Sequence, residues 1–468
     1  MTPDDRALAE RYPELPSLAV LLDPEALEQV SAAWGRGYAI ERLRLKPGAS
    51  VTAVLRPPAH DGAGPSLPWL LARGLAPQLW ATKRNKDVRA AEKSWRSLVK
   101  AAEANTGSCA GEHAITGPRG PAVVADDEHR VLVTPAIGDR QLEGLRRLLP
   151  DTGIPVRLER LAGDGPFAAM PDEVGDLRRR GTVRTLSHNP ARRFVGHWSP
   201  ERGDGPGYNV RLHAGRRREI TPFVPGRPWR LGDDVPAIEE MAAERARVAA
   251  ESGRPWGRPD IAGALRAAAA GIAAIDVAGR DWAARGARLA SELTARLAHV
   301  GVAAAHGDLS GDQLVITSGA REGCSATPSF CVPWDWRHRV TCRTGGSHGT
   351  PNQSRKSPLG TEADVAVLDW DRAGLWPTGW DAATWAVTSA LTAATDGTGA
   401  TDGPAQGTSA VEPCGDVLAA VALLRAPEPF RRRYAGWAGL TEELVTLAER
   451  SVGRVGCGPV ALTPGGVR

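Results

Sequence analysis

The sequence lacks long apolar runs, and this absence argues against a membrane-spanning segment. Its most apolar run, AAAAGIAAIDVAG, is alanine-rich and is broken by Asp276, whereas a helix that crosses a bilayer needs about 20 apolar residues. The N-terminal stretch MTPDDRALAERYPELP carries acids and prolines, where a secretory signal needs basic residues followed by an apolar core. We therefore expect a cytoplasmic protein that does not bind a membrane.

Paired cysteines are also missing, which argues against a secreted fold held together by disulfides. The six cysteines are scattered and include no CxxC pair. Three of them, Cys324, Cys331 and Cys342, lie in one segment with His338 and His348. Their spacing matches no common zinc module, so a zinc-binding insert is a weak alternative that a metal analysis would test.

A strong excess of one charge is absent too. The net charge is only +4 over 468 residues, which gives no reason to expect a nucleic-acid partner. The composition, 42% hydrophobic and 24% charged, is typical of a soluble globular protein. A chain of this length exceeds one ordinary core, so we expect two or three structural units.

Two segments in the first half of the chain resemble each other. LRLKPGASVTAVLRP at 43–57 and LSHNPARRFVGHWSP at 186–200 both predict a strand, a tight turn at proline and a returning strand. A short strand with a basic residue is expected after each, LWATKR around Lys83 and YNVRLH around Arg211. The first half is therefore predicted to contain two related β modules.

The second half changes to a helical period. Helices are predicted in DDVPAIEEMAAERARVAAESG, along the face of Trp282, Leu289, Leu293 and Leu297, and in three segments after residue 374. We expect an α+β protein with a β-rich N-terminal half and a mainly helical C-terminal lobe. The predicted parts are 1–180 (a β-rich module with one long helix), 181–232 (a second β module and hinge) and 233–468 (a helical lobe). A disordered insertion at 318–364 and a flexible loop at 395–414 are expected in that lobe.

The stretch AAAHGDLSGDQLVI at 303–316 carries the main chemical signal. Phosphoryl transfer to a hydroxyl needs a carboxylate near the acceptor oxygen and oxygen ligands for Mg²⁺. Asp308 is the candidate carboxylate, and Gln313 supplies an amide five positions later. Asp369 and Asp371 follow the apolar run VAVL. The two motifs in this order favour a kinase-like pair of loops over a plain turn with solvated acids.

With these motifs, residues of about 181–450 resemble the aminoglycoside phosphotransferase and choline kinase-like family, which has the bilobal protein-kinase fold. HGDLSGDQ matches its H-G-D-x4-N signature, LDWDRAG its aspartate dyad, and WDAATW a third segment with Asp381 at the first acid. PFVPGRPW resembles its hinge between lobes. The resemblance implies Asp308 as catalytic base and Gln313, Asp369 and Asp371 as the magnesium site. It also implies that His306 braces the loop.

Two features depart from the family pattern. Gln313 stands where the family usually has asparagine, and its carbonyl lies one methylene further out. The family also holds the nucleotide phosphates with a lysine on a small-lobe strand. The chain has only six lysines and none in the second β module, so the candidate nucleotide-binding residues are Arg211 there and Lys83 in the first module. Arginine binds phosphate through a planar fork, so the exchange is not neutral.

The resulting expectation is an ATP- and Mg²⁺-dependent phosphotransferase. Its partners would be the nucleotide and a small soluble acceptor with a hydroxyl group, such as a sugar, an aminoglycoside-like compound or a metabolite alcohol. Tryptophans after the second motif, among them Trp376 and Trp380, could stack on a sugar or belong to the core. The alternative is a catalytically weak, pseudokinase-like binding or regulatory protein.

Overall fold

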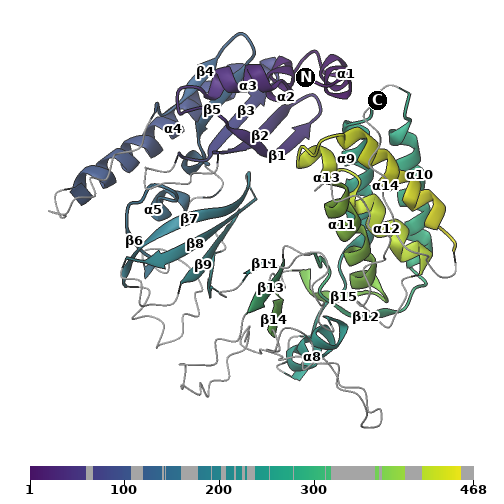
Figure 1. The fold of residues 1–468 in the computed structure, drawn as a ribbon. Helices are drawn as coiled ribbons and strands as arrows, with labels where there is room; N and C mark the ends of the chain where they lie inside the picture. The colour runs from purple at the N-terminus through teal and green to yellow at the C-terminus, as the bar shows by residue number, and fades with distance from the viewer. Residues whose placement is uncertain are drawn as a thin grey trace, which may run out of the picture. The chain divides into compact units, whose positions relative to one another are not determined.

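The computed structural model divides the chain into two compact units (Figure 1). Unit 1 comprises Met1–Phe223 with Arg431–Arg433, and unit 2 comprises Val224–Phe430 with Tyr434–Arg468. The structure describes every residue except 59–66, 107–119, 140, 141, 143, 160–177, 191, 202–206, 215–217, 224–226, 229–237, 252, 254, 278, 311–312, 318–363, 368–371, 396–413 and 455–468.

Unit 1 opens with three short helices that were not predicted from the sequence. They are α1 (Pro3–Arg11), α2 (Pro16–Leu22) and α3 (Pro24–Ser31). Each begins with proline, which loses nothing in the first turn because the N–H there has no intrahelical partner. Helix α2 packs on the first sheet.

The first sheet has the strand order β1-β2-β3-β5-β4, with all neighbours antiparallel. Its strands are β1 (Ala39–Lys46), β2 (Ser50–Arg56), β3 (Leu70–Leu75), β4 (Val124–Asp126) and β5 (Val131–Pro135). The long helix α4 (Pro77–Thr106) joins β3 to β4 and packs against β5. A short 3₁₀ turn, η1 (Ala136–Gly138), follows β5.

The second sheet repeats this antiparallel arrangement in the order β10-β9-β8-β7-β6. Helix α5 (Leu145–Leu148) precedes it. Its strands are β6 (Val156–Arg157), β7 (Arg180–Asn189), β8 (Arg193–Pro200), β9 (Tyr208–His213) and β10 (Arg218–Pro222). Four residues separate β9 from β10, so this module has no helix after its third strand.

The structure confirms that both repeated segments are strand–turn–strand hairpins. Strand β1 pairs with β2 around a turn at Pro47, and β7 pairs with β8 around a turn at Pro190. Gly48 in the first turn has a φ of +66°, a left-handed conformation that glycine adopts without strain.

The third strand of the first module was predicted in the wrong place. LWATKR forms the start of helix α4 rather than a strand, and the exposed Lys83 lies on that helix. Pro77 at the first helical position favours this helix start. The true third strand is β3, where Arg73 pairs with Thr52 of β2. In the second module Arg211 pairs with Val195 of β8. Thr52 and Val195 occupy the same place in the two hairpins, so Arg73 is the counterpart of Arg211.

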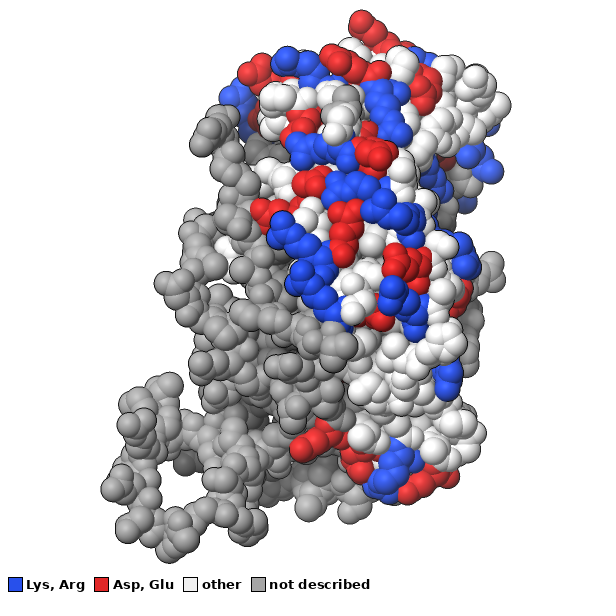
Figure 2. Space-filling model, turned by 90° about the vertical axis from the view of Figure 1, so that its right-hand side faces the viewer, with Lys and Arg blue, Asp and Glu red and all other residues white. Residues whose placement is uncertain are grey.

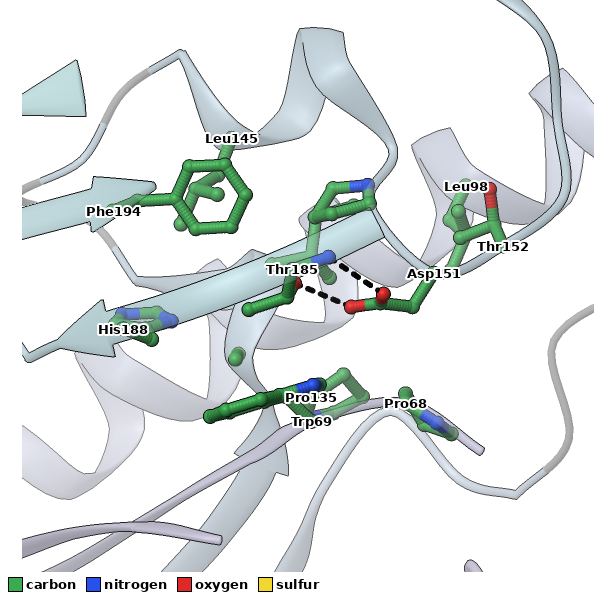
Figure 3. Close-up of a pocket in the computed structure, with 13 residues that line it drawn as sticks. Pro68, Trp69, Leu98, Pro135, Leu145, Asp151, Thr152, Thr185, His188 and Phe194 are labelled. Atoms are coloured by element: carbon green, nitrogen blue, oxygen red, sulfur yellow. Dashed lines mark hydrogen bonds between the residues drawn. The ribbon is translucent and has the colours of Figure 1, made fainter. Parts of the chain in front are cut away.

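One hydrophobic cluster joins the two β modules inside unit 1. It combines Leu98 of α4 and Ile137 of η1 with Phe194, Trp198 and Val210 of the second sheet. A cavity of about 20 Å³ remains beside it, with room for about one water molecule. Figure 3 shows its edge, where Asp151 accepts hydrogen bonds from the backbone N–H and the hydroxyl of Thr185. The seam between the modules is packed, and the cavity in it is too small for a ligand.

Unit 2 is a helical bundle with two small antiparallel sheets. Its helices are α8 (Ile238–Glu251), α9 (Ile261–Ala274), α10 (Trp282–Leu297), α11 (Trp380–Thr395), α12 (Gly415–Arg425), α13 (Glu428–Arg431) and α14 (Trp437–Ser451). Helix α12 contacts α9, α10, α11 and α14. It is apolar and buried almost all round, as a central helix must be.

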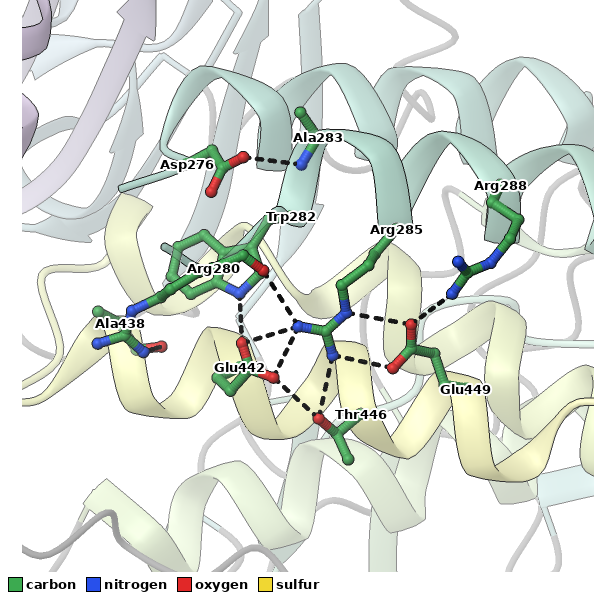
Figure 4. A network of polar contacts seen from close by, with 10 residues as sticks. All are labelled: Asp276, Arg280, Trp282, Ala283, Arg285, Arg288, Ala438, Glu442, Thr446 and Glu449. Atoms are coloured by element: carbon green, nitrogen blue, oxygen red, sulfur yellow. Dashed lines mark hydrogen bonds and ion pairs between the residues drawn. The ribbon is translucent and has the colours of Figure 1, made fainter. Parts of the chain in front are cut away.

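Charged side chains join α10 to α14 on the outside of the bundle (Figure 4). Arg285 pairs with Glu442 at 2.8 Å and with Glu449 at 2.9 Å, and the indole of Trp282 donates to Glu442. Burial raises the pKa of Glu442, but the hydrogen bonds from Trp282 and Arg285 and the charge of Arg285 outweigh it. The pKa therefore lies below its usual range. Figure 2 shows acidic and basic side chains interspersed on the face that it presents, with no large field of one sign.

The small sheets position the loops that carry the predicted motifs. One joins β11 (Arg227–Pro228), β13 (Leu314–Thr317) and β14 (Asp364–Val367), and the other joins β12 (Val302–Ala305) to β15 (Gly374–Pro377). Strands β13 and β14 pair directly although residues 318–363 separate them. Most of the predicted insertion at 318–364 lies outside the described residues, and its last residue, Asp364, begins β14.

The α+β class and the helical second half are confirmed. All the described segments predicted as helices in unit 2 are helical, although α8 begins at Ile238 and the predicted first-turn acids Asp233 and Asp234 lie outside the described residues. The predicted loop at 395–414 also lies outside them, apart from Thr395, which ends α11, and Cys414, which precedes α12.

Candidate active site

The His-Gly-Asp motif forms a loop directly after β12. The last residue of this strand, Ala305, pairs with Gly374 at the start of β15. The chain then turns through His306, Gly307 and Asp308 before it reaches β13. The loop therefore leaves a short, paired strand at a fixed point of unit 2.

Asp381, in the first turn of α11, fixes the backbone of this loop. Its two carboxylate oxygens accept the N–H groups of His306 at 2.6 Å and of Gly307 at 2.8 Å. Asp381 is only 3% exposed, and hydrogen bonds from N–H groups to a buried carboxylate are among the stronger ones in proteins. The side chain of His306 is fully buried, and its bracing role stays a prediction.

Gly307 is required where the loop turns. Its φ is +85°, and a Cβ there would lie 2.3 Å from Nε1 of Trp376 and 2.4 Å from the carbonyl oxygen of Arg372. The indole of Trp380 donates to the Gly307 carbonyl at 3.3 Å, and the rings of Trp376 and Trp380 stack with centroids 4.5 Å apart. Both tryptophans are buried, so they support the loop and do not offer a surface for a sugar.

The carboxylate of Asp308 lies at the open side of the loop, and its side chain is 28% exposed. It is bracketed by two arginines. Arg425, the last residue of α12, donates to Oδ1, and Nε of Arg372 lies 3.5 Å from Oδ2. The sequence reading did not anticipate either contact. A guanidinium group thus lies beside each oxygen of this carboxylate.

Gln313 caps the following turn. Its Oε1 accepts the N–H of Ser310 at 3.2 Å, and its own N–H donates to the Ser310 carbonyl at 3.0 Å. A carbonyl oxygen has two lone pairs, so this amide can accept one further partner and fits an oxygen ligand of Mg²⁺. Leu314, the residue after Gln313, pairs with Val367 at the end of β14. Asp369 and Asp371 lie outside the described residues.

Arg211 lies on a polar face of the second sheet. Directly paired residues put Arg184, His197 and Asn209 in one row of this face, and Arg211 beside Glu219 in the next. The opposite face carries the apolar cluster described above. Burial lowers the pKa of His197, and the charge of Arg184 lowers it further. Arg211 lies 3.9 Å from Glu219, and its side chain is 14% exposed.

Helices lie on both sides of β3 in the first sheet. Successive strand residues point to opposite sides: Gly74 faces α2, where a Cβ would lie 1.9 Å from Oγ of Ser17, and Arg73 pairs with Asp87 of α4 at 2.8 Å. Strand β1 of the same sheet is largely half-buried or exposed. Lys83 is on the exposed surface of α4 and does not lie on the sheet.

The proposed zinc alternative cannot be located on the described part of the chain. Cys324, Cys331, Cys342, His338 and His348 all lie outside it. Among the described residues, no group of three or more His, Cys, Asp or Glu side chains could hold a metal ion. No helix in the described ranges is long and apolar enough to cross a membrane.

Comparison with known proteins adds little to this geometry. No family model matches the chain, and no curated protein matches it. Among solved structures, the chain is similar to an ethanolamine kinase from Plasmodium vivax, at 9% sequence identity and a TM-score of 0.28. That similarity covers 62% of this chain and 84% of the other. A likeness of this size carries no conclusion about fold or function, which depend on the residues described above.

Proposed function

We propose that this chain is a phosphotransferase that moves the γ-phosphoryl group of Mg²⁺-bound ATP to a hydroxyl of a small soluble acceptor. The observation that carries the proposal is the construction of the His-Gly-Asp loop. Asp381 holds two consecutive backbone N–H groups, and the Asp308 side chain that follows stays 28% exposed. A plain turn needs neither a buried carboxylate under its backbone nor a glycine wedged against two tryptophans.

In the proposed reaction Asp308 accepts the proton of the acceptor hydroxyl. The acceptor oxygen forms a bond to the γ-phosphorus, the bond from that phosphorus to the β,γ-bridging oxygen breaks, and ADP leaves. Positioned general bases of this kind contribute about 10²- to 10⁴-fold in rate. Mg²⁺, when bound, would neutralise the phosphate charge, and Gln313, Asp369 and Asp371 are the residues proposed to hold it.

Arg211 is the proposed contact for the nucleotide phosphates. It lies on the third strand of the second module, on a face that carries Arg184 and His197 and is not covered by the shared core. Lys83 is not proposed for this role, because it lies on helix α4 with its side chain exposed and not on a strand of the sheet. Arg73 has the matching strand position, but it is hydrogen-bonded to Asp87 at 2.8 Å, whereas Arg211 lies 3.9 Å from Glu219.

Ligand-dependent stability of the full chain tests this proposal first. MgATP at a hundred times its dissociation constant should add about 2.7 kcal/mol to the free energy of unfolding. Asp369→Ala should lose this gain. Asp308→Asn should keep it, because Asp308 is proposed to act on the acceptor and not on the nucleotide.

Transfer itself is measured with γ-labelled ATP and a panel of sugars and small alcohols. Asp308→Asn should lower the rate by at least about 10²-fold. A wild-type rate in Asp308→Asn would sink the proposal. Failure of MgATP to stabilise the wild-type chain at millimolar concentration would favour the alternative of a non-catalytic regulatory protein.

A further inference from the structure

The candidate base has an unusual environment for a group that must meet a neutral hydroxyl. Both of its oxygens face guanidinium groups, Arg425 on one side and Arg372 on the other. A carboxylate needs no arginine to accept a proton from an alcohol. The two arginines therefore suggest a role in binding a ligand, in addition to holding Asp308.

Arg425 is held rigidly and still has donors to offer. It ends α12, the buried central helix of the bundle, and its side chain is 23% exposed. Only its Nη2 reaches Asp308, and the other guanidinium nitrogens make no hydrogen bond to any residue in the described ranges. Because arginine carries five N–H donors in a planar fork, most of its capacity remains for a second anion.

Arg372 supplies the other half of the arrangement. Its backbone is fixed, since the indole of Trp376 donates to its carbonyl oxygen at 2.9 Å. Its side chain is 66% exposed and reaches Asp308 only at 3.5 Å. A loosely held, exposed guanidinium beside a rigid one can close on a small anion from solvent without breaking a buried pair.

Resting on the proposed function, we infer that the acceptor carries an anionic group, a carboxylate or a phosphate, close to the hydroxyl that is phosphorylated. Arg425 and Arg372 bind this group, and Asp308 between them binds the hydroxyl. Planar arginine forks suit carboxylate and phosphate, to which they can donate two parallel hydrogen bonds. Cationic acceptors such as aminoglycosides are disfavoured, because they would meet two guanidinium groups at the point of transfer.

Anion binding can be measured without any turnover. The probes are inorganic phosphate and D-glycerate, each added to the full chain without nucleotide. Glycerol, which has the hydroxyls of glycerate but no carboxylate, is the matched control ligand, and ionic strength is held constant with chloride. We expect phosphate and glycerate, but not glycerol, to raise the thermal midpoint.

Two substitutions locate the site. Arg425→Gln should abolish the rise caused by phosphate and glycerate, and Arg288→Gln should not. Arg288 is a suitable control because it is an arginine of unit 2 that makes an ion pair away from the loop, with Glu449 at 2.8 Å. Asp308→Asn removes a competing negative charge, so phosphate should bind about fivefold more tightly or better. If the arginines serve only to hold Asp308, neither the wild type nor Asp308→Asn will bind phosphate or glycerate. That result would overturn the inference.

Adding MgATP separates the acceptor's anion from the nucleotide's own terminal phosphate. If the arginines serve the acceptor, the stabilisation by glycerate should add to that by MgATP. Competition between the two ligands would assign the arginines to the nucleotide and overturn the inference. Stabilisation by MgATP alone would leave the proposed function standing while the acceptor class failed.

Discussion

The two β modules of unit 1 share a hairpin design and the position of a third-strand arginine, yet they differ in what covers their sheets. In the first, α2 and α4 contact opposite sides of β3, and strand β5 is buried throughout. In the second, β9 alternates strictly between buried and half-buried residues. Its inner face joins the shared core, and its outer face is polar.

This difference assigns separate tasks to two similar segments. The third strand of the first module has its side chains engaged by helices on both sides, which suits a scaffold. A sheet with one polar face, lined by arginine and histidine, keeps the capacity to bind an anion. We expect the first module to hold the second in place through their shared core, and the predictions below test that division.

The largest expected effect comes from the core that joins the modules. Trp198 is 1% exposed, and its indole donates to the Val156 carbonyl at 3.2 Å. Trp198→Ala should lower the free energy of unfolding by about 3–5 kcal/mol. Because the cluster includes Leu98 of α4, hydrogen exchange should become faster in β2–β3 as well as in β8–β9.

Leu186→Ala is the matched control in the same sheet, since Leu186 is 41% exposed. It should change stability by less than about 0.5 kcal/mol. Faster exchange confined to β8–β9 in Trp198→Ala would mean that the modules are stable independently, which contradicts the scaffold role.

The second prediction compares the two third-strand arginines. Arg211→Ala should remove most of the roughly 2.7 kcal/mol gained from MgATP at a hundred times its dissociation constant. Arg73→Ala should lower stability without ligand but keep that gain, and Lys83→Ala should change neither. The thermal midpoint of each variant with and without MgATP distinguishes these results. Loss of the gain in Arg73→Ala alone would exchange the tasks of the two modules.

The third prediction concerns the acids that face these arginines. Asp87 bonds to Arg73 at 2.8 Å and is 10% exposed, whereas Glu219 lies 3.9 Å from Arg211. Asp87→Ala should cost about 2 kcal/mol, since it leaves a half-buried guanidinium without its hydrogen-bonded partner. Glu219→Ala should cost less than Asp87→Ala, because 3.9 Å is too long for a direct hydrogen bond to Arg211. Urea unfolding of the two variants checks the ratio, and equal costs would contradict a scaffold role that is specific to the first module.

Sequence alone predicted the elements whose patterns are local. The hairpins around Pro47 and Pro190 and the helix containing Leu289 and Leu293 depend on turn chemistry and apolar spacing, and all are present. The His-Gly-Asp loop was found for the same reason, because its residues are adjacent in the chain. Lys83 was misplaced because an apolar residue beside a basic one fits both a short strand and the first turn of a helix.

The contacts that complete the site could not be predicted, since they join residues far apart in sequence. Arg425 reaches Asp308 across more than a hundred residues, and Arg73 reaches Asp87 only because β3 and α4 pack together. Asp381 was placed by its resemblance to a family motif, but its two bonds to the loop backbone follow from the packing of α11. Such pairs carry no local period that a sequence pattern could reveal.

The smallest expected effect is a pH dependence at the seam between the modules. Burial raises the pKa of Asp151 above its ordinary value, although its hydrogen bonds with Thr185 oppose this. A carboxyl whose pKa is higher in the folded state favours folding most at low pH. That contribution is lost as the pH rises through the folded pKa. Wild-type stability should therefore fall in the range above pH 4, because the buried carboxyl must ionise there.

Asp151→Asn removes the ionisation but can keep both contacts with Thr185, since its amide accepts from the N–H and donates to the hydroxyl. The thermal midpoint of the variant should equal or exceed that of the wild type near pH 4, and the difference should grow toward pH 7. Asn also tolerates the left-handed φ of +60° at this position, but that benefit does not vary with pH. Only a difference in thermal midpoint that widens with pH reports the buried carboxyl. A constant difference would mean that Asp151 is already ionised at pH 4. The seam would then be more open to water than the packing of the modules implies.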